Sequence, residues 1–147
     1  MRENLYNLKR FINAQDDVYG NVIKELKSGH KETHWMWFIF PQLKGLGRCE
    51  MANFYGIENI NEAIAYTKNN ILWNRYLECC DILLNLENLT IYEILGAIDS
   101  IKLCSSLTLF YEVLKAPVLD KLLKKFFNGD KCNLTLNMLN KKVQQLK

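Results

Sequence analysis

An aromatic segment with polar borders is the part of this sequence best suited to hold a ligand. The run His34-Trp35-Met36-Trp37-Phe38-Ile39-Phe40-Pro41-Gln42 places four large aromatic rings within six residues, and two closely spaced glycines follow it. Tryptophan stacks on planar bases, histidine exchanges protons near neutral pH, and glycine lets a ligand approach backbone N–H groups. The pattern predicts a pocket lined by His34, Trp35, Trp37, Gln42, Gly45 and Gly47. The alternative is a buried helical turn, because each aromatic ring buries about 150 to 250 Å² when it packs in a core.

A second polar cluster lies in the segment DSIKLCSSLTLF, between apolar residues. On a helix, Asp99 and Lys102 are three positions apart and Lys102 and Ser106 four apart, so the three side chains project from one side. Asp99 would then orient the Lys102 ammonium, which could hold a phosphate or carboxylate together with the hydroxyls. The cluster of candidate ligand-binding residues is Asp99, Lys102, Ser105, Ser106 and Thr108. The competing interpretation is an ordinary salt bridge, with hydroxyls that bond back to their own helix.

Arg10-Phe11 and Ala14-Gln15 would lie about one helical turn apart, which makes Arg10 and Gln15 candidates for a third wall of the same pocket. Several familiar catalytic patterns do not occur in the sequence: the phosphate loop ending in G-K-[ST], the G-x-S-x-G elbow, H-E-x-x-H and the dinucleotide-binding glycine motif. We therefore expect no P-loop ATPase, no hydrolase of the elbow type and no zinc protease.

The five cysteines predict neither a metal site nor a disulfide framework. Their number is odd, two are adjacent and none forms a C-x-x-C pair; they are Cys49, Cys79, Cys80, Cys104 and Cys132. This usage favours a reducing intracellular compartment. We expect no metal and no cofactor.

Length and charge narrow the class of protein further. The chain has 147 residues and a formal net charge of +3, from 19 basic and 16 acidic residues, which is too small a surplus to indicate a nucleic-acid surface. The longest apolar run, Trp35 to Phe40, has six residues, whereas a bilayer span needs roughly 20. No apolar stretch of signal-peptide length lies near the N-terminus. These features predict a cytoplasmic protein with no nucleic-acid and no membrane partner, whose residues 1–147 form one domain.

Helical periodicity runs along the whole sequence. Leucine occurs 23 times and valine five times, a balance that favours helix over strand. Apolar residues at three-and-four spacing predict two amphipathic helices in the first 27 residues, with Leu5 and Leu8 opening the first pattern, and a last helix from Leu134 to about Leu146.

Start signals mark further helices. Asn59 with Glu62 and Thr90 with Glu93 have the form of capped starts, for helices over 60–68 and up to Gly96. Stripes over 71–84 and 118–127 have the same period, and Pro117 stands where a helix tolerates proline. The sequence predicts an all-α fold, a compact single-domain bundle of about seven to nine helices.

These motifs resemble a known family. The pattern comprises RF-x-x-AQ near the start, HWMWFIFPQ-x-x-GLG, EA-x-x-Y from Glu62, D-x-x-K-x-x-SS-x-TLF from Asp99, and FF-x-G-x-x-x-x-x-T around Phe127. It is similar to the bacterial domain-of-unknown-function family 1810, whose members are sometimes labelled calpastatin. The resemblance covers nearly the whole chain and implies a small, all-helical, single-domain fold. It implies no particular reaction. The sequence departs from the family at Arg48-Cys49, where a small polar residue is usual, so the resemblance supports no ligand contact there.

Two functions from different classes fit these residues. In the first, the polar groups converge on a pocket for a small anionic, ring-bearing ligand of the nucleotide or ADP-ribose class. Trp35 or Trp37 would stack the ring, Lys102 and the serines would bind phosphate, and His34 would move a proton during hydrolysis or transfer, with bound water as the nucleophile. In the second, the protein is a non-catalytic module: a ligand sensor, or a surface that recognises a protein partner through exposed aromatic side chains.

Overall fold

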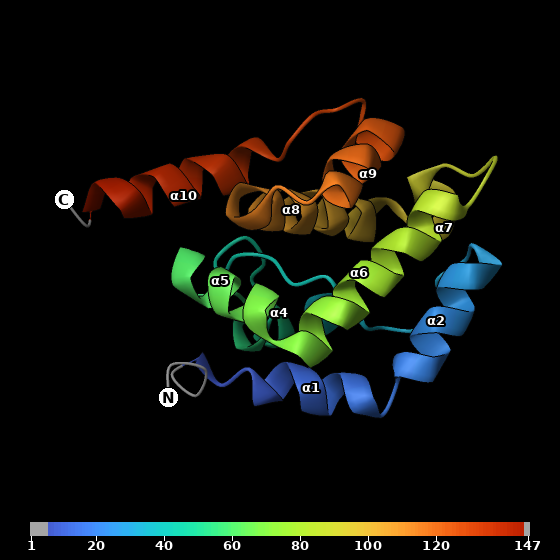
Figure 1. The fold of residues 1–147 in the computed structure, drawn as a ribbon, viewed down its shortest axis with the longest axis horizontal. Helices are drawn as coiled ribbons and strands as arrows, with labels where there is room; N and C mark the ends of the chain where they lie inside the picture. The colour runs from blue at the N-terminus through green and yellow to red at the C-terminus, as the bar shows by residue number, and fades with distance from the viewer. Residues whose placement is uncertain (1–5, 146–147) are drawn as a thin grey trace.

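The computed structural model describes residues 6–145, which form ten helices and no strand. Figure 1 shows their arrangement. The helices are α1 (Lys9–Asp16), α2 (Tyr19–Ser28), α3 (Met36–Ile39), α4 (Glu50–Phe54), α5 (Ile60–Lys68), α6 (Asn70–Asn85), α7 (Ile91–Leu95), α8 (Ala97–Leu114), α9 (Pro117–Phe127) and α10 (Asn133–Gln145). The all-α prediction is confirmed, and the helix count slightly exceeds the predicted range. The short helices α3 and α4, of four and five residues, are too brief to show a helical repeat in the sequence.

The predicted starts coincide with real caps. Asn59 Oδ1 accepts a hydrogen bond from the Glu62 N–H at 3.0 Å, and Thr90 and Glu93 form a reciprocal capping box at the start of α7. The two helices predicted before residue 28 are α1 and α2. Leu5 and Leu146, which belonged to the predicted first and last patterns, lie outside the described residues.

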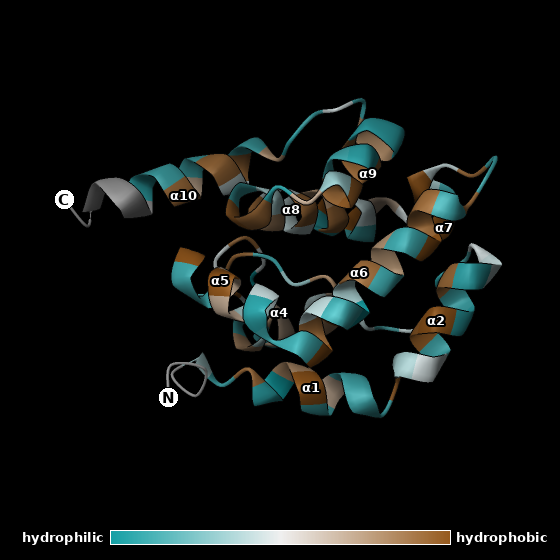
Figure 2. Ribbon diagram, viewed as in Figure 1, coloured by the Kyte–Doolittle hydropathy of each residue, from teal (hydrophilic) through white to brown (hydrophobic). Residues whose placement is uncertain are grey.

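Helix α8 is the central element of the fold. It packs against α5, α7, α9, α10 and α3, and in Figure 2 much of its length is hydrophobic. In Figure 1 it lies beside α9 and α10 at the top of the view, whereas α1 lies at the bottom and α6 runs obliquely between them. Because α8 has neighbours on several sides, only part of its surface meets solvent. Its polar residues elsewhere are buried.

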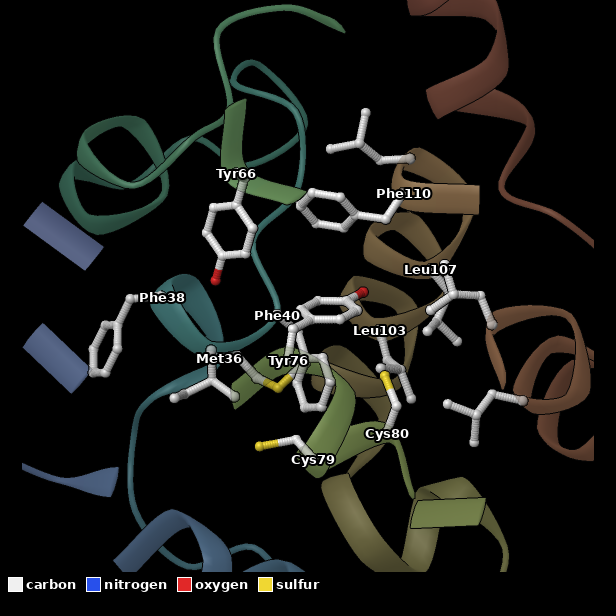
Figure 3. Close-up of a cluster of buried hydrophobic side chains, with 14 of the residues drawn as sticks. Met36, Phe38, Phe40, Tyr66, Tyr76, Cys79, Cys80, Leu103, Leu107 and Phe110 are labelled. Atoms are coloured by element: carbon white, nitrogen blue, oxygen red, sulfur yellow. The ribbon is translucent and has the colours of Figure 1, made fainter. Parts of the chain in front are cut away.

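Aromatic rings from three helices form the middle of the core. Phe110 of α8 lies 4.9 Å from Tyr76 of α6 and 5.2 Å from Tyr66 of α5, measured between ring centroids. Figure 3 shows these rings together with Phe40, whose centroid lies 5.4 Å from that of Tyr76. The predicted aromatic segment therefore contributes part of its rings to packing, and Phe40, at the end of α3, packs against α6.

A sharp turn at Gly96 joins α7 to α8. Its φ of 87° lies in the region that side chains rarely adopt, so a substitution there is strained. The turn leaves the first residues of α8 facing the loop that precedes α3. Within residues 6–145, no helix combines the length and the apolar character needed to cross a membrane.

Candidate functional site

The aromatic segment and the start of α8 enclose an open cavity of about 430 Å³, called here the α3/α8 cavity. Its lining comes from the loop before α3, from α3 itself and from the turn between α7 and α8. The residues are Lys31, His34, Trp35, Met36, Trp37, Leu95, Gly96, Ala97, Ile98, Asp99 and Lys102. Two segments that the sequence analysis placed in one pocket do meet here, through His34 and both tryptophans on one side and Asp99 and Lys102 on the other.

Glu25 of α2 fixes the loop that leads into the aromatic segment. Its Oε1 accepts hydrogen bonds from the N–H groups of Glu32 (2.7 Å) and Thr33 (2.8 Å), and from Nε1 of Trp35 (3.1 Å). The Thr33 hydroxyl donates to Oε2 at 2.6 Å. Burial alone would raise the pKa of Glu25, but the donors from Thr33, Glu32 and Trp35 outweigh it and lower the pKa to about 2. The ionised carboxylate thus holds the loop in one conformation.

Two lysines flank the carboxylate of Asp99. Lys31 Nζ lies 2.9 Å from Asp99 Oδ2, and Lys102 Nζ lies 3.7 Å from Oδ1. Each ammonium also lies over an indole ring, with Lys31 5.0 Å from the Trp35 centroid and Lys102 5.2 Å from that of Trp37. Two ammonium groups against one carboxylate leave the polar wall of the cavity with a surplus of positive charge.

The N-terminus of α8 adds to this positive potential. Gly96 stands at the N-cap and has no side chain to cap the helix, so the first N–H groups, around Ala97 and Ile98, receive no side-chain acceptor from it. The helix has 18 residues and its first turn lines the cavity. Aligned peptide dipoles make such a terminus favourable for an anion.

The tryptophans differ in what they offer a ligand. Trp35 is 1% exposed and its indole N–H donates to Glu25, so its ring is mainly a packing element. Trp37 is partly exposed, and its buried Nε1 has no hydrogen-bond partner among the described residues. Trp37 is therefore the better stacking surface of the two.

The hydroxyls of α8 point away from the α3/α8 cavity. Ser106 is completely buried, with Oγ 2.8 Å from the Tyr76 hydroxyl. Ser105 bonds to the Ile101 carbonyl at 3.1 Å, and Thr108 Oγ1 accepts from the Cys132 N–H at 2.9 Å. None of the three is among the cavity-lining residues, which corrects the expectation that they share one hollow with Lys102.

Arg10 and Gln15 lie in other parts of the molecule. Arg10 forms an ion pair with Glu62 at 2.9 Å and donates to the carbonyls of Phe54 and Gly56. It lines a separate hollow of about 300 Å³. Gln15 is buried and donates to the Phe38 carbonyl at 2.7 Å. The structure therefore places both residues in supporting positions and not in a third wall of the α3/α8 cavity.

Gln42, Gly45 and Gly47 do not line the α3/α8 cavity, contrary to the prediction. Gln42 lines a neighbouring pocket of about 10 Å³ that shares Trp37 and Lys102 with the larger cavity. At Gly47 a Cβ atom would come within 2.6 Å of the Ala52 Cβ, so a close chain contact explains this glycine. Gly45 has a φ of 104° and is exposed.

Besides the apolar lining residues Met36, Leu95, Ala97 and Ile98, three residues beside the α3/α8 cavity were not predicted as candidates from the sequence. Lys31 and Gly96 line it, and the only signals were a lysine just before the aromatic segment and a glycine that also begins α8. The third, Cys49, caps α4, where its Sγ accepts from the Ala52 N–H at 3.4 Å. That bond, and to a smaller extent the charge of Lys102, lower the pKa of Cys49. Across residues 6–145, no group of three or more His, Cys, Asp or Glu side chains is placed to hold a metal ion.

Comparisons with known proteins agree with the fold. The chain superposes on the crystal structure of the conserved hypothetical protein Rv1873 from Mycobacterium tuberculosis with a TM-score of 0.92 and 41% sequence identity, covering 93% of this chain and 99% of that one. The search of curated proteins found no match. The profile of the family described as protein of unknown function (DUF1810) matches residues 5–139. The chain therefore belongs to the DUF1810 family.

Proposed function

We propose that this protein binds a small anionic ligand with a planar ring, of the nucleotide or ADP-ribose class, in the α3/α8 cavity. The observation that carries the proposal is the arrangement of Lys31 and Lys102 on either side of Asp99, at the first turn of an 18-residue helix that lines the cavity. A volume of about 430 Å³ falls in the range of roughly 300 to 1,000 Å³ that small-molecule sites occupy.

The polar wall of the cavity is suited to bind the anionic part of the ligand. A phosphate near Ala97 and Ile98 would accept hydrogen bonds from the first N–H groups of α8, and the helix dipole would favour its charge. Lys31 and Lys102 would approach the same phosphate from two sides, with Asp99 holding both ammonium groups in place. In this proposal backbone N–H groups replace the hydroxyls of Ser105 and Ser106 as phosphate ligands.

The apolar part of the lining is suited to pack against the ring of the ligand. Met36, Leu95 and Ile98 line the cavity beside Trp37, and Ile98 is 72% exposed. A planar base laid against Trp37 and Ile98 would bury this apolar surface and gain stacking energy. A ligand with both a ring and a phosphate uses the two walls together.

Hydrolysis or transfer is a second candidate function, because His34 lines the same cavity. An imidazole near a bound phosphate or glycosidic bond would relay a proton to or from an attacking water. The rival without chemistry is a sensor that binds the same ligand, and a turnover assay distinguishes the two. Recognition of a protein partner by an aromatic surface has less support, since Trp35 and Trp73 are buried. We place the protein in the cytoplasm, a reducing compartment that fits its five free cysteines.

A thermal-shift panel tests the proposal. The panel contains AMP, ADP, NAD, ADP-ribose, ribose 5-phosphate and inorganic phosphate, each with wild type and with Lys102→Met. A ligand at 100 times its dissociation constant adds about 2.7 kcal/mol to the free energy of unfolding. We expect a ring-bearing phosphate to raise the melting temperature of wild type, and Lys102→Met to reduce the shift.

Lys121→Met is the matched control. Lys121 is an exposed lysine of α9 that does not line the α3/α8 cavity, so this variant is expected to keep the full shift. An absence of any shift in wild type at millimolar ligand, or equal losses in the two lysine variants, would count against the proposal.

A further inference from the structure

Two cysteines that are far apart in the sequence belong to neighbouring segments, where α8 passes the start of α10. Cys104 lies on α8, and Cys132 immediately precedes α10. Cys104 Sγ is 3.6 Å from the Asp130 carbonyl oxygen, and the Cys132 N–H donates to Thr108 Oγ1 at 2.9 Å. Residues 130–132 therefore lie along the turn of α8 that carries Cys104.

Cys132 is surrounded by groups that stabilise a thiolate. Its carbonyl accepts the Leu136 N–H at 3.2 Å, which makes Cys132 the N-cap of the 13-residue helix α10. Ser105 Oγ lies 3.3 Å from the Cys132 sulfur. The groups that act on the sulfur itself are Ser105 of α8 and, in the first turn of α10, Leu134 and Thr135, so the sulfur lies between these two elements.

A buried hydroxyl beside this sulfur lacks a partner. Thr135, in the first turn of α10, is 0% exposed, and its Oγ1 has no hydrogen-bond partner among the described residues. An orphaned hydroxyl in a dry site costs about 1 to 3 kcal/mol. A Cys132 thiolate would offer this hydroxyl an acceptor, in agreement with the contribution of Thr135 to the lowered pKa of Cys132.

The two sulfurs have opposite acid–base character. Burial alone would raise the pKa of Cys132, but Ser105, Thr135 and the N–H group of Leu134 outweigh burial and lower it. For Cys104, burial and then the neighbouring charge of Cys132 raise the pKa to about 11. One cysteine thus favours the nucleophilic thiolate, while its neighbour stays protonated.

We propose that Cys132 and Cys104 form a peroxide-sensitive thiol pair, in which Cys132 is oxidised first and Cys104 then closes a reversible disulfide between α8 and the start of α10. The proposal rests on the juxtaposition of the two cysteines and on the donors around Cys132. It concerns a different part of the molecule from the α3/α8 cavity and does not depend on the proposed function.

The chemistry balances with hydrogen peroxide as the oxidant. The Cys132 thiolate attacks one peroxide oxygen, an S–O bond forms, the O–O bond breaks, and the departing hydroxide takes a proton to become water. Sulfur loses two electrons and peroxide gains them, leaving a sulfenic acid. Cys104 sulfur then attacks Cys132 sulfur; the S–S bond forms, the S–O bond breaks, and the hydroxide leaves with the proton of Cys104 as a second water.

The other cysteines provide internal comparisons. Cys79 and Cys80 are fully buried, and burial raises the pKa of both thiols. Cys49 is exposed and caps α4. If exposure alone governed oxidation, Cys49 would react before Cys132.

The test is peroxide titration of the reduced full chain, followed by alkylation of the remaining thiols and peptide mapping without reduction. We expect a Cys104–Cys132 linked peptide, a mass loss of two hydrogen atoms, and full reversal by dithiothreitol. Cys104→Ser is expected to stop at a Cys132 sulfenic acid that dimedone traps. Cys49→Ser is the matched control and is expected to form the disulfide as wild type does.

Positioning of the thiolate is tested with Ser105→Ala and Thr135→Val, which are expected to slow the loss of the Cys132 thiol several-fold. In wild type the rate of thiol loss rises with pH as Cys132 ionises. In both variants we expect this rise to occur at a higher pH. Circular dichroism checks that each variant is folded, and Cys104→Ala replaces Cys104→Ser if the latter is not. Oxidation confined to Cys49, or over-oxidation of Cys132 while Cys104 remains alkylatable, would overturn the proposal.

Discussion

Lys31 Nζ lies 2.9 Å from the carboxylate of Asp99, and this ion pair ties the loop before α3 to the first turn of α8. The Lys31 side chain is only 7% exposed, because it also lies over the ring of Trp35. The contact joins two segments from different parts of the chain and forms the polar wall of the α3/α8 cavity. Asp99 therefore positions the lysines while it reduces the positive charge available to a ligand.

Replacing Asp99 by asparagine shows which of these two effects on ligand binding is larger. The variant removes a negative charge beside the proposed phosphate position, and we expect the affinity for an anionic ligand to rise by about 1 kcal/mol, roughly fivefold. Titration calorimetry at low ionic strength measures the change. Asp120→Asn, on α9, is the matched control and is expected to have no effect. An unchanged affinity of Asp99→Asn would show that the ligand's charge lies elsewhere, and a weaker affinity would show that the positioning of the two lysines outweighs the charge of Asp99.

Glu25 makes the stability of the aromatic loop depend on pH. Its pKa falls from 4.5 to about 2 on folding, so its stabilising contribution is fully present above pH 4.5 and is lost as the pH falls toward 2. Glu25→Gln is expected to lower the free energy of unfolding at pH 7 by roughly 2 to 3 kcal/mol. Urea unfolding at several pH values checks this, with the exposed Glu32→Gln as control. A gap between wild type and Glu25→Gln that stays constant down to pH 2 would contradict this role.

Ser106 is expected to act in stability and not in binding. Ser106→Ala leaves the buried Tyr76 hydroxyl without its partner at 2.8 Å, at a cost of about 1 to 3 kcal/mol. The double variant Ser106→Ala with Tyr76→Phe removes both polar atoms and is expected to be more stable than Ser106→Ala alone. Chemical denaturation and ligand titration of the same samples make the comparison. A loss of ligand affinity in folded Ser106→Ala would contradict this and show that Ser106 contributes to ligand binding.

The ion pair between Arg10 and Glu62 is buried, with side chains 9% and 2% exposed. Arg10→Met leaves the Glu62 carboxylate charged and without its cation, and we expect a loss of about 3 to 5 kcal/mol. Combining it with Glu62→Gln removes that charge and is expected to recover part of the loss. Thermal unfolding of the two single variants and the double variant measures the coupling. A cost below about 1 kcal/mol for Arg10→Met would indicate a solvated pair.

Helical spacing predicted which side of α8 each side chain projects from, but not whether the side chain is buried. Asp99, Lys102 and Ser106 do belong to one face of the helix, as their spacing requires. The neighbours of that face change along its length: the first turn lines the α3/α8 cavity, while at Ser106 the face is covered by Tyr76 of α6. A pattern within one helix carries no information about where a second helix crosses it.

The residues that shape the loop before α3 were harder to predict for a similar reason. Glu25 is a charged residue beside Leu26 in an amphipathic helix, and its donors follow in the loop at Glu32, Thr33 and Trp35. Nothing in the spacing distinguishes it from a solvated glutamate. The regular helices were predictable because caps and apolar repeats are local, whereas α3 and α4 are too short to show a repeat.

The most direct test of a ligand site at the start of α8 is an NMR titration of backbone amides with the best ligand of the thermal-shift panel. We expect the largest chemical-shift changes on Ala97, Ile98 and Asp99, together with the Trp37 indole N–H, and we expect Lys31→Met to weaken the binding that causes them. Shift changes centred on the separate hollow that Arg10 lines, with the first turn of α8 unaffected, would contradict a ligand site at the start of α8.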